Sequence, residues 1–470
     1  MKSERIYVMR SWALLLLTGL ALFAGPVWEF LPDLTWNDGP IANAMLWHDR
    51  QRIEQAALLL IVAVGAATIW RDSLYNTLAN LPRPVRWALG FGFALGGVSA
   101  VLSEFPRFGG LEWATLLLLS CLAFLLASQA RFGGGNFDVW AVRLVVVVSG
   151  VIVLRIMMGY LAATIQGIRL DSIALFTSVF SNRRVFGQVA SMVIPLLAYP
   201  LLASGYTRLQ RWGIFMLLAL WWMLVIVSGT RGTWMALSVA AVILAFVAWR
   251  TCVGWLRIQV AAFGVGAFLF WGLFVLLPVL LGQDATIENR LSNIESLSGR
   301  GELWAMAWTQ IQAHPWLGIG PMHLAAMPFE YGAHPHNAVL QLAAEWGVIA
   351  TLAIILPAVF GIYHLLARLR QQASDHPTNV LLMCLSASLL AAGAQSMVDG
   401  VIVMPYSQLW LALIAGWTFG VYFRYENGFC SNVVSRYFRF VIPALSLFAL
   451  TLLMNGIFPE ALYRAQATKA

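Results

Sequence analysis

Long apolar runs separated by short polar breaks make up almost the whole chain. Runs of about 18 or more apolar residues are typical of transmembrane helices, because a helix needs about 20 residues to cross a bilayer. The runs are continuous rather than alternating, so they predict helices and not the strands of a membrane barrel. The sequence therefore predicts an all-α polytopic membrane protein with about 12–13 transmembrane helices. The predicted spans are 11–31, 55–70, 86–103, 111–129, 140–164, 185–204, 211–228, 232–249, 257–281, 347–367, 379–398, 402–423 and 440–458.

One long polar break interrupts this pattern, from Gln283 to Asn337. Connections of this length are uncommon in compact proteins and usually have a function of their own. The sequence thus predicts three segments: an N-terminal transmembrane bundle over 1–282, a loop with short helices over 283–346, and C-terminal transmembrane helices over 347–470.

The arginines predict the orientation of the chain. With the N-terminus inside the cell, almost every cytoplasmic loop carries at least two arginines, as the positive-inside rule requires, and the long loop lies outside. Lys2, Arg5 and Arg10 precede a first apolar run that resembles a signal peptide. No small-residue cleavage site follows this run, so we expect a retained first span.

Composition adds little to this picture. The net charge of +8 would suggest a nucleic-acid partner for a soluble protein. Arginines at the ends of membrane helices account for most of this charge, so we expect no nucleic-acid partner. Four cysteines among 470 residues show no metal-binding spacing, and we do not expect a disulfide framework.

Several arginines fall on the outer side, where the positive-inside rule gives them no role. Arg155 lies within a predicted span, where a charge costs several kcal/mol unless it is paired or hydrated, so it suggests a functional site. Arg183 and Arg184 follow in the next outer segment, and we expect them to bind substrate as well. Ion pairing or snorkelling to the interface is the alternative, and it is favoured for Arg169 and Arg290.

Two short segments combine glycine, arginine and a predicted helix start. The first runs from Ser228 to Trp234 and joins two spans with almost no loop, and the second runs from Ser298 to Trp304. A helix N-terminus offers free N–H groups and the positive end of the helix dipole, and glycine lets an anion approach closely. Arg231 and Arg300 add guanidinium groups that grip a phosphate at two points. Each segment predicts an anion site; the alternative is a tight or capped turn.

The second helix is expected to run from Ser298 to about His314, where Pro315 stops it. Trp304, Ala307, Trp308 and Ile311 would form one apolar stripe along it. The stripe predicts a helix that lies along the membrane or packs on the bundle.

The long loop ends in His334-Pro335-His336-Asn337, directly before a helix that runs to Gly347. These residues suit metal binding, base catalysis or simple capping, but no third ligand with a recognised spacing supports a metal. A histidine near its ordinary pKa takes a proton from a hydroxyl, so we expect His336 to act as a base or to position the substrate. His334 and Asn337 are expected to bind substrate. For Glu345, two roles stay open: orienting a partner residue or packing alone.

Taken in order, these motifs resemble the O-antigen ligase superfamily. This superfamily includes ligases that join O-antigen to lipid A-core, related polymerases and pilin O-oligosaccharyltransferases. The resemblance covers roughly residues 180–400 and depends on the order and spacing of short motifs. The motifs are Ser228–Gly232, Gly299–Trp304, His314–Gly320, His334–Asn337 and Glu345–Gly347.

The resemblance implies an inverting glycosyltransferase of the bacterial inner membrane that uses no metal ion or other cofactor and faces the periplasm. Its donor would be a glycan on undecaprenyl pyrophosphate, and its acceptor lipid A-core. Arg231 and Arg300, helped by Arg184 and Arg155, would stabilise the charge that grows on the diphosphate. His336 would take the proton of the acceptor hydroxyl or align it. The site is therefore expected at the junction of the loop with the membrane bundle.

Three alternatives remain. A pilin O-oligosaccharyltransferase uses the same donor with a protein acceptor, and a polymerase transfers to another lipid-linked glycan. A transporter belongs to a different class and predicts polar residues along the midplane of the bundle, where this sequence has few.

Overall fold

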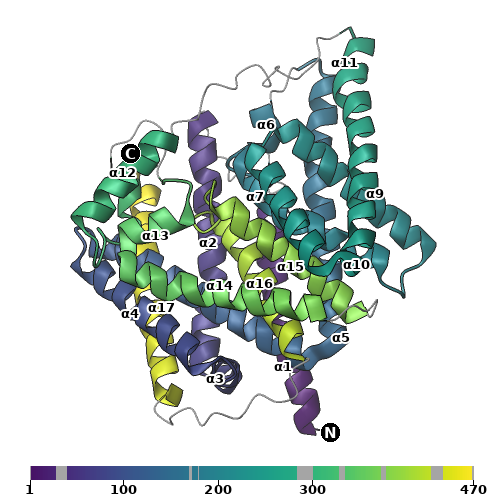
Figure 1. The fold of residues 1–470 in the computed structure, drawn as a ribbon. Helices are drawn as coiled ribbons and strands as arrows, with labels where there is room; N and C mark the ends of the chain where they lie inside the picture. The colour runs from purple at the N-terminus through teal and green to yellow at the C-terminus, as the bar shows by residue number, and fades with distance from the viewer. Residues whose placement is uncertain are drawn as a thin grey trace. The chain divides into compact units, whose positions relative to one another are not determined.

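The computed structural model describes residues 2–27, 40–168, 172–177, 179–282, 300–327, 334–371, 377–424 and 438–467. In these ranges the chain forms helices joined by turns and contains no β-strand (Figure 1). The all-α class predicted from the hydrophobic pattern is confirmed. The expected roles of Arg169, Arg290 and the cap at Ser298 lie outside the described residues.

Within the described residues, each predicted span coincides largely with one helix or with consecutive helices. The helices are α1 (Lys2–Val27), α2 (Pro40–Ala67), α3 (Arg71–Ala79), α4 (Arg83–Leu102), α5 (Pro106–Ile165), α6 (Ser172–Thr177), α7 (Arg183–Leu197), α8 (Tyr199–Leu202), α9 (Arg208–Ser228), α10 (Arg231–Phe270), η2 (Trp271–Leu276), α11 (Leu277–Leu280), α12 (Arg300–Ala313), η3 (His323–Ala326), α13 (Ala338–Trp346), α14 (Val348–Gln371), α15 (Pro377–Ser396), α16 (Pro405–Arg424) and α17 (Phe438–Ala467).

Two of these helices each hold two predicted spans. α5 continues through a non-helical residue at Gly134 (φ 54°, ψ −142°), and α10 through one at Ala248 (φ −137°, ψ 46°). By length and composition, 8 helices in the described ranges are able to cross a membrane, or 9 if the bent pair α2–α3 is one span. This number is below the expected 12–13 partly because α5 and the α10–α11 stretch each count once.

The chain folds into two compact units, each made of three separate stretches. Unit 1 comprises Met1–Glu54, Gly133–Glu295 and Leu365–Ile414. Unit 2 comprises Gln55–Phe132, Ser296–His364 and Ala415–Ala470. The three segments expected along the chain, 1–282, 283–346 and 347–470, stay a prediction.

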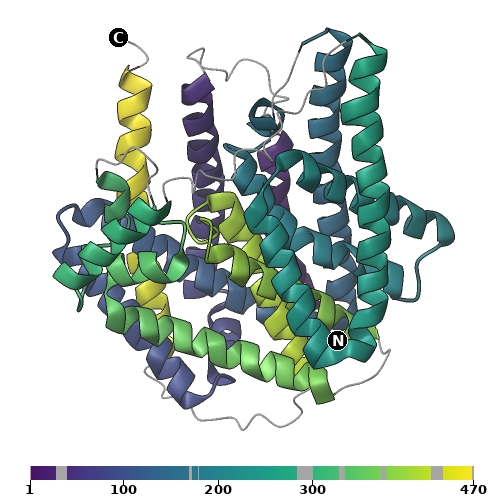
Figure 2. The ribbon, with the colours of Figure 1, turned by 45° about the horizontal axis from the view of Figure 1, so that its top comes forward.

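The core of unit 1 is a bundle in which α7, α9, α10 and α15 pack on one another (Figures 1 and 2). Phe186 of α7 stacks on Trp221 of α9, with ring centroids 5.2 Å apart. The last carbonyls of α7 are satisfied from α10: Trp255 Nε1 donates to Pro195 O at 3.2 Å, and Gln259 Nε2 donates to Ile194 O at 3.1 Å. Such cross-helix bonds matter in a membrane bundle because lipid offers no replacement partner.

In unit 2, the turn after α12 interlocks with the junction of α13 and α14. Three backbone hydrogen bonds of 2.9 Å join them: from Ile319 to Ala344, from Gly320 to Glu345, and from Val348 to Pro315. Two glycines permit this approach. A Cβ on Gly318 would overlap the Glu345 carbonyl, and one on Gly347 would overlap the Trp316 carbonyl. Both also have positive φ, 66° and 85°, which favours glycine.

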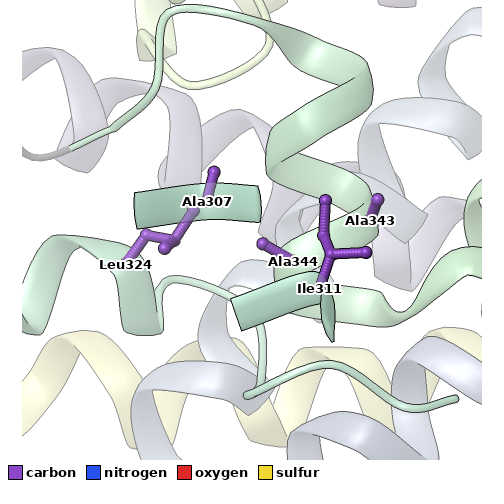
Figure 3. Close-up of a cluster of buried hydrophobic side chains, with 5 residues drawn as sticks. All are labelled: Ala307, Ile311, Leu324, Ala343 and Ala344. Carbon is purple, nitrogen blue, oxygen red and sulfur yellow. The ribbon is translucent and has the colours of Figure 1, made fainter. Parts of the chain in front are cut away.

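A small apolar core lies beside this interlock (Figure 3). Ala307 and Ile311 of α12 meet Leu324 of η3 and Ala343 and Ala344 of α13. Ala307 and Ile311 of the stripe expected on α12 pack in this core, and Leu303 of the same helix is also buried. Trp304 and Trp308 of the stripe are 39% and 55% exposed.

Gly347→Ala is expected to destabilise the protein by more than about 2 kcal/mol, because the backbone conformation of Gly347 (φ 85°, ψ 160°) is nearly exclusive to glycine. Thermal unfolding of the purified protein in detergent measures the loss. Gly90→Ala in α4 of the same unit is the control: a Cβ there meets nothing within 4 Å. Equal melting temperatures for the two variants would contradict the interlock.

Candidate functional site

Two helices of unit 1 begin at the predicted arginines. α7 starts at Arg183, and Asn182 caps it by accepting the backbone N–H of Arg184 on Oδ1 at 2.9 Å. α10 starts at Arg231, directly after Gly229 ends α9 in the left-handed conformation (φ 60°). The predicted helix start within the Ser228–Trp234 turn is confirmed. Each start presents the positive end of a helix dipole beside an arginine.

The two starts adjoin one another. A Cβ on Gly187 of α7 would lie 2.9 Å from Thr230 Oγ1, at the N-cap of α10. Buried hydroxyls line the contact: Ser228 Oγ and Thr230 Oγ1 are 2.9 Å apart, and Thr230 Oγ1 donates to Thr233 Oγ1 at 3.0 Å. Arg183, Arg184 and Arg231 therefore come from two neighbouring helix N-termini.

Asp399 is a buried carboxylate that sequence reasoning missed. Its Oδ1 accepts from Gln188 Nε2 at 3.0 Å and from the Gly400 N–H at 2.8 Å, and its Oδ2 accepts from Gln395 Nε2 at 3.2 Å. Ser407 Oγ donates to Gln188 Oε1 at 2.7 Å, so the network joins α7, α15 and α16 within unit 1. The available signal was an acidic residue at the edge of a predicted span, since such charges are rare without a role.

Arg155 makes a contact that its sequence position does not reveal. Its side chain is buried in unit 1, and Nη1 donates to Pro26 O at 2.6 Å, in the last turn of α1. A cation at a helix C-terminus satisfies carbonyls that have no partner within the helix and complements the helix dipole. This bond gives Arg155 a structural role, and its expected role in substrate binding stays a prediction.

In unit 2 the two loop histidines lie together. The rings of His334 and His336 are 4.2 Å apart at 79°, and both side chains are buried. His336 has φ 53°, one of two positive values at non-glycine residues in the described chain; the other is at Met322. A residue held in this strained region is a frequent feature of functional sites.

Asn337 and Trp304 hold this turn in place. Asn337 caps α13, and its Oδ1 accepts the N–H groups of Val339 and Leu340 at 3.0 Å each. Trp304 Nε1 donates to Pro335 O at 2.8 Å. Since residues four apart share a helix face, Arg300, at the first position of α12, lies on the side of α12 that meets the histidine turn.

Glu345 is a buried carboxyl group near the other end of α13. Its Oε1 accepts the Leu324 N–H at 3.3 Å, and its carbonyl accepts from Ser99 Oγ at 2.9 Å. The pKa of Glu345 is raised to about 8, chiefly by burial and also by the charge of Glu112, while hydrogen bonds from Met322, Leu324 and Gln341 act to lower it. At neutral pH this side chain is therefore mostly protonated.

The predicted site residues thus form two groups in the structure. Arg155, Arg183, Arg184 and Arg231 lie in unit 1, and Arg300, His334, His336 and Asn337 lie in unit 2. Among the described side chains, no group of three or more His, Cys, Asp or Glu has an arrangement suited to a metal ion. The junction expected between loop and bundle stays a prediction.

The helices define the class of the molecule: an all-α, multi-pass membrane protein. Residues 214–355 match the family model described as O-Antigen ligase, so the predicted superfamily is confirmed over these residues. The match includes Arg231, Arg300, His334, His336 and Asn337 and covers less than half of the chain. It supports membrane glycosyl transfer of the ligase, polymerase or oligosaccharyltransferase type. No curated protein matches the chain.

Glu345 predicts a pH dependence of stability. Its pKa is raised in the folded protein, from an ordinary 4.5 to about 8. Between these values the unfolded chain has lost the proton and the folded protein still holds it, so stability falls as pH rises from about 4.5 to about 8. Glu345→Gln is expected to flatten this part of the curve in detergent melting experiments. An unchanged slope in the variant would show that other groups cause the dependence.

Proposed function

We propose that this protein is an inner-membrane glycosyltransferase that moves a glycan from undecaprenyl pyrophosphate to lipid A-core at the periplasmic face. The observation that carries the proposal is the pair of adjoining helix N-termini in unit 1 with Arg183, Arg184 and Arg231. The family match over residues 214–355 supports the reaction class.

The donor explains why such a site belongs in a membrane bundle. A polyprenyl diphosphate carries a long apolar tail and a strongly charged head group. Helix N-termini and guanidinium groups bind phosphate oxygens with charge-assisted hydrogen bonds, which are strong where water is excluded. Apolar walls of the bundle suit the tail. Arginines at the ends of membrane helices therefore suit a donor with a charged head group and an apolar tail.

The proposed reaction is a single displacement. The acceptor hydroxyl oxygen attacks the anomeric carbon from the face opposite the diphosphate, and His336 takes the hydroxyl proton. The bond from the anomeric carbon to the diphosphate oxygen breaks, and its electron pair leaves with the diphosphate. From the order of the sequence motifs, Arg231 and Arg300 are proposed to stabilise the charge on the departing group. The products are the inverted glycoside and undecaprenyl pyrophosphate, and no metal ion takes part.

Two variants test the role of His336. His336→Asn removes the base but keeps a residue that tolerates φ 53°, so it is expected to fold normally and to lose transfer by about 100-fold. His336→Ala adds backbone strain and is expected to lose both activity and stability. The assay uses purified protein in nanodiscs with lipid-linked glycan and either lipid A-core or pilin.

Glycosylated lipid A-core is the expected product. Transfer to pilin alone would replace the ligase function with protein O-oligosaccharyl transfer. If neither acceptor is glycosylated and no undecaprenyl pyrophosphate is released, the proposal is wrong. Near-normal transfer by His336→Asn would remove His336 from the mechanism.

A further inference from the structure

Trp304 is both exposed and held in one orientation. Its side chain is 39% exposed, yet Nε1 donates to Pro335 O at 2.8 Å. Trp308, one turn further along α12, is 55% exposed and makes no such bond within the described residues. The bond ties the indole of Trp304 to the histidine turn, while part of its side chain stays exposed.

The partner of this bond places the indole ring beside the histidines. Pro335 stands between His334 and His336, whose rings are 4.2 Å apart. The other side of α12 is occupied, since Leu303, Ala307 and Ile311 are buried. The open side of α12 at Trp304 therefore adjoins the group that takes the acceptor proton in the proposed reaction.

The chemistry of this arrangement suits a sugar ring. One face of a pyranose carries C–H bonds, which bear a small positive charge, and the face of an indole carries a negative one. His334 and His336 flank Pro335, the partner of the indole N–H, and Arg300 lies one helical turn before Trp304. Imidazole and guanidinium groups hydrogen bond to sugar hydroxyls. A flat aromatic face with a polar edge thus sets both the plane and the rotation of a bound sugar.

We propose that Trp304 is the stacking residue for the acceptor sugar, the ring whose hydroxyl attacks the donor. This inference rests on the proposed function and goes beyond it, because it assigns acceptor recognition to a residue outside the histidine turn. The bond to Pro335 keeps the indole plane constant relative to His336. The bound acceptor sugar is then held in one orientation, with its hydroxyl directed at the base.

The test compares three variants in initial-rate measurements with lipid A-core at saturating lipid-linked glycan. Trp304→Leu keeps an apolar side chain without an aromatic face, and it is expected to raise the acceptor KM about tenfold. Trp304→Phe keeps a face but loses the bond to Pro335, and it is expected to have an intermediate KM. Trp308→Leu is the matched control on the same helix and should match the wild type. The KM for the donor should stay within about twofold of the wild type in all three.

A change in donor KM in Trp304→Leu, or an equal effect of Trp308→Leu, would overturn the inference. Equal effects are the result expected if both tryptophans only anchor α12 in the membrane interface. An unchanged acceptor KM in Trp304→Leu would also overturn it.

A binding measurement separates this inference from the proposed function. Saturation-transfer NMR of delipidated core oligosaccharide with His336→Asn protein needs no turnover. Signals from sugar C–H protons are expected, and they should vanish when Trp304→Leu is added but not when Trp308→Leu is added. Binding of this kind without transfer by the wild type would contradict the proposed function and support the stacking role. Signals that survive Trp304→Leu would exclude it.

Discussion

The geometry around the histidines depends on a close approach of two backbone segments in unit 2. Gly318 and Gly347 have no side chains, so the turn after α12 and the end of α13 are joined by backbone hydrogen bonds. The other end of α13 is capped by Asn337, the residue after His336. A histidine with φ 53° is thereby held at the start of a helix that is fixed at both ends. Preorganisation of this kind avoids reorganisation during the reaction.

In unit 1, hydrogen bonds between buried polar side chains hold the helices in place. An apolar bundle leaves a buried donor or acceptor without water, so each needs a protein partner. The carboxylate of Asp399 accepts from Gln188 and Gln395 and links helices that are distant in sequence. The hydroxyls of Thr230 and Thr233 fill the contact beside Gly187. These bonds hold the helix starts at Arg183 and Arg231.

Hydropathy was sufficient to predict the helices, because burial in lipid depends on local composition. Local signals were also sufficient to predict the starts of α7 and α10, because glycine and capping residues act within a few positions of a helix end. The bond from Arg155 to Pro26 joins residues 129 positions apart, and no local pattern encodes it. The apolar stripe of α12 holds the buried Ala307 and Ile311 as well as the exposed Trp304, and hydropathy alone does not distinguish them. The His314–Gly320 motif was recognised by resemblance. Its packing role is visible only in the structure, where Gly318 lies against the Glu345 carbonyl.

The central claim is that arginines at two adjoining helix starts bind the diphosphate, and it is tested most directly by the affinity for undecaprenyl pyrophosphate. Purified wild type, Arg184→Gln, Arg231→Gln and His336→Asn proteins in nanodiscs are compared. We predict that each arginine variant binds about tenfold or more weakly, since a charge-assisted hydrogen bond contributes about 1.5–3 kcal/mol, and that His336→Asn binds as tightly as the wild type. Unchanged affinity in both arginine variants, or an equal loss in His336→Asn, would contradict the account.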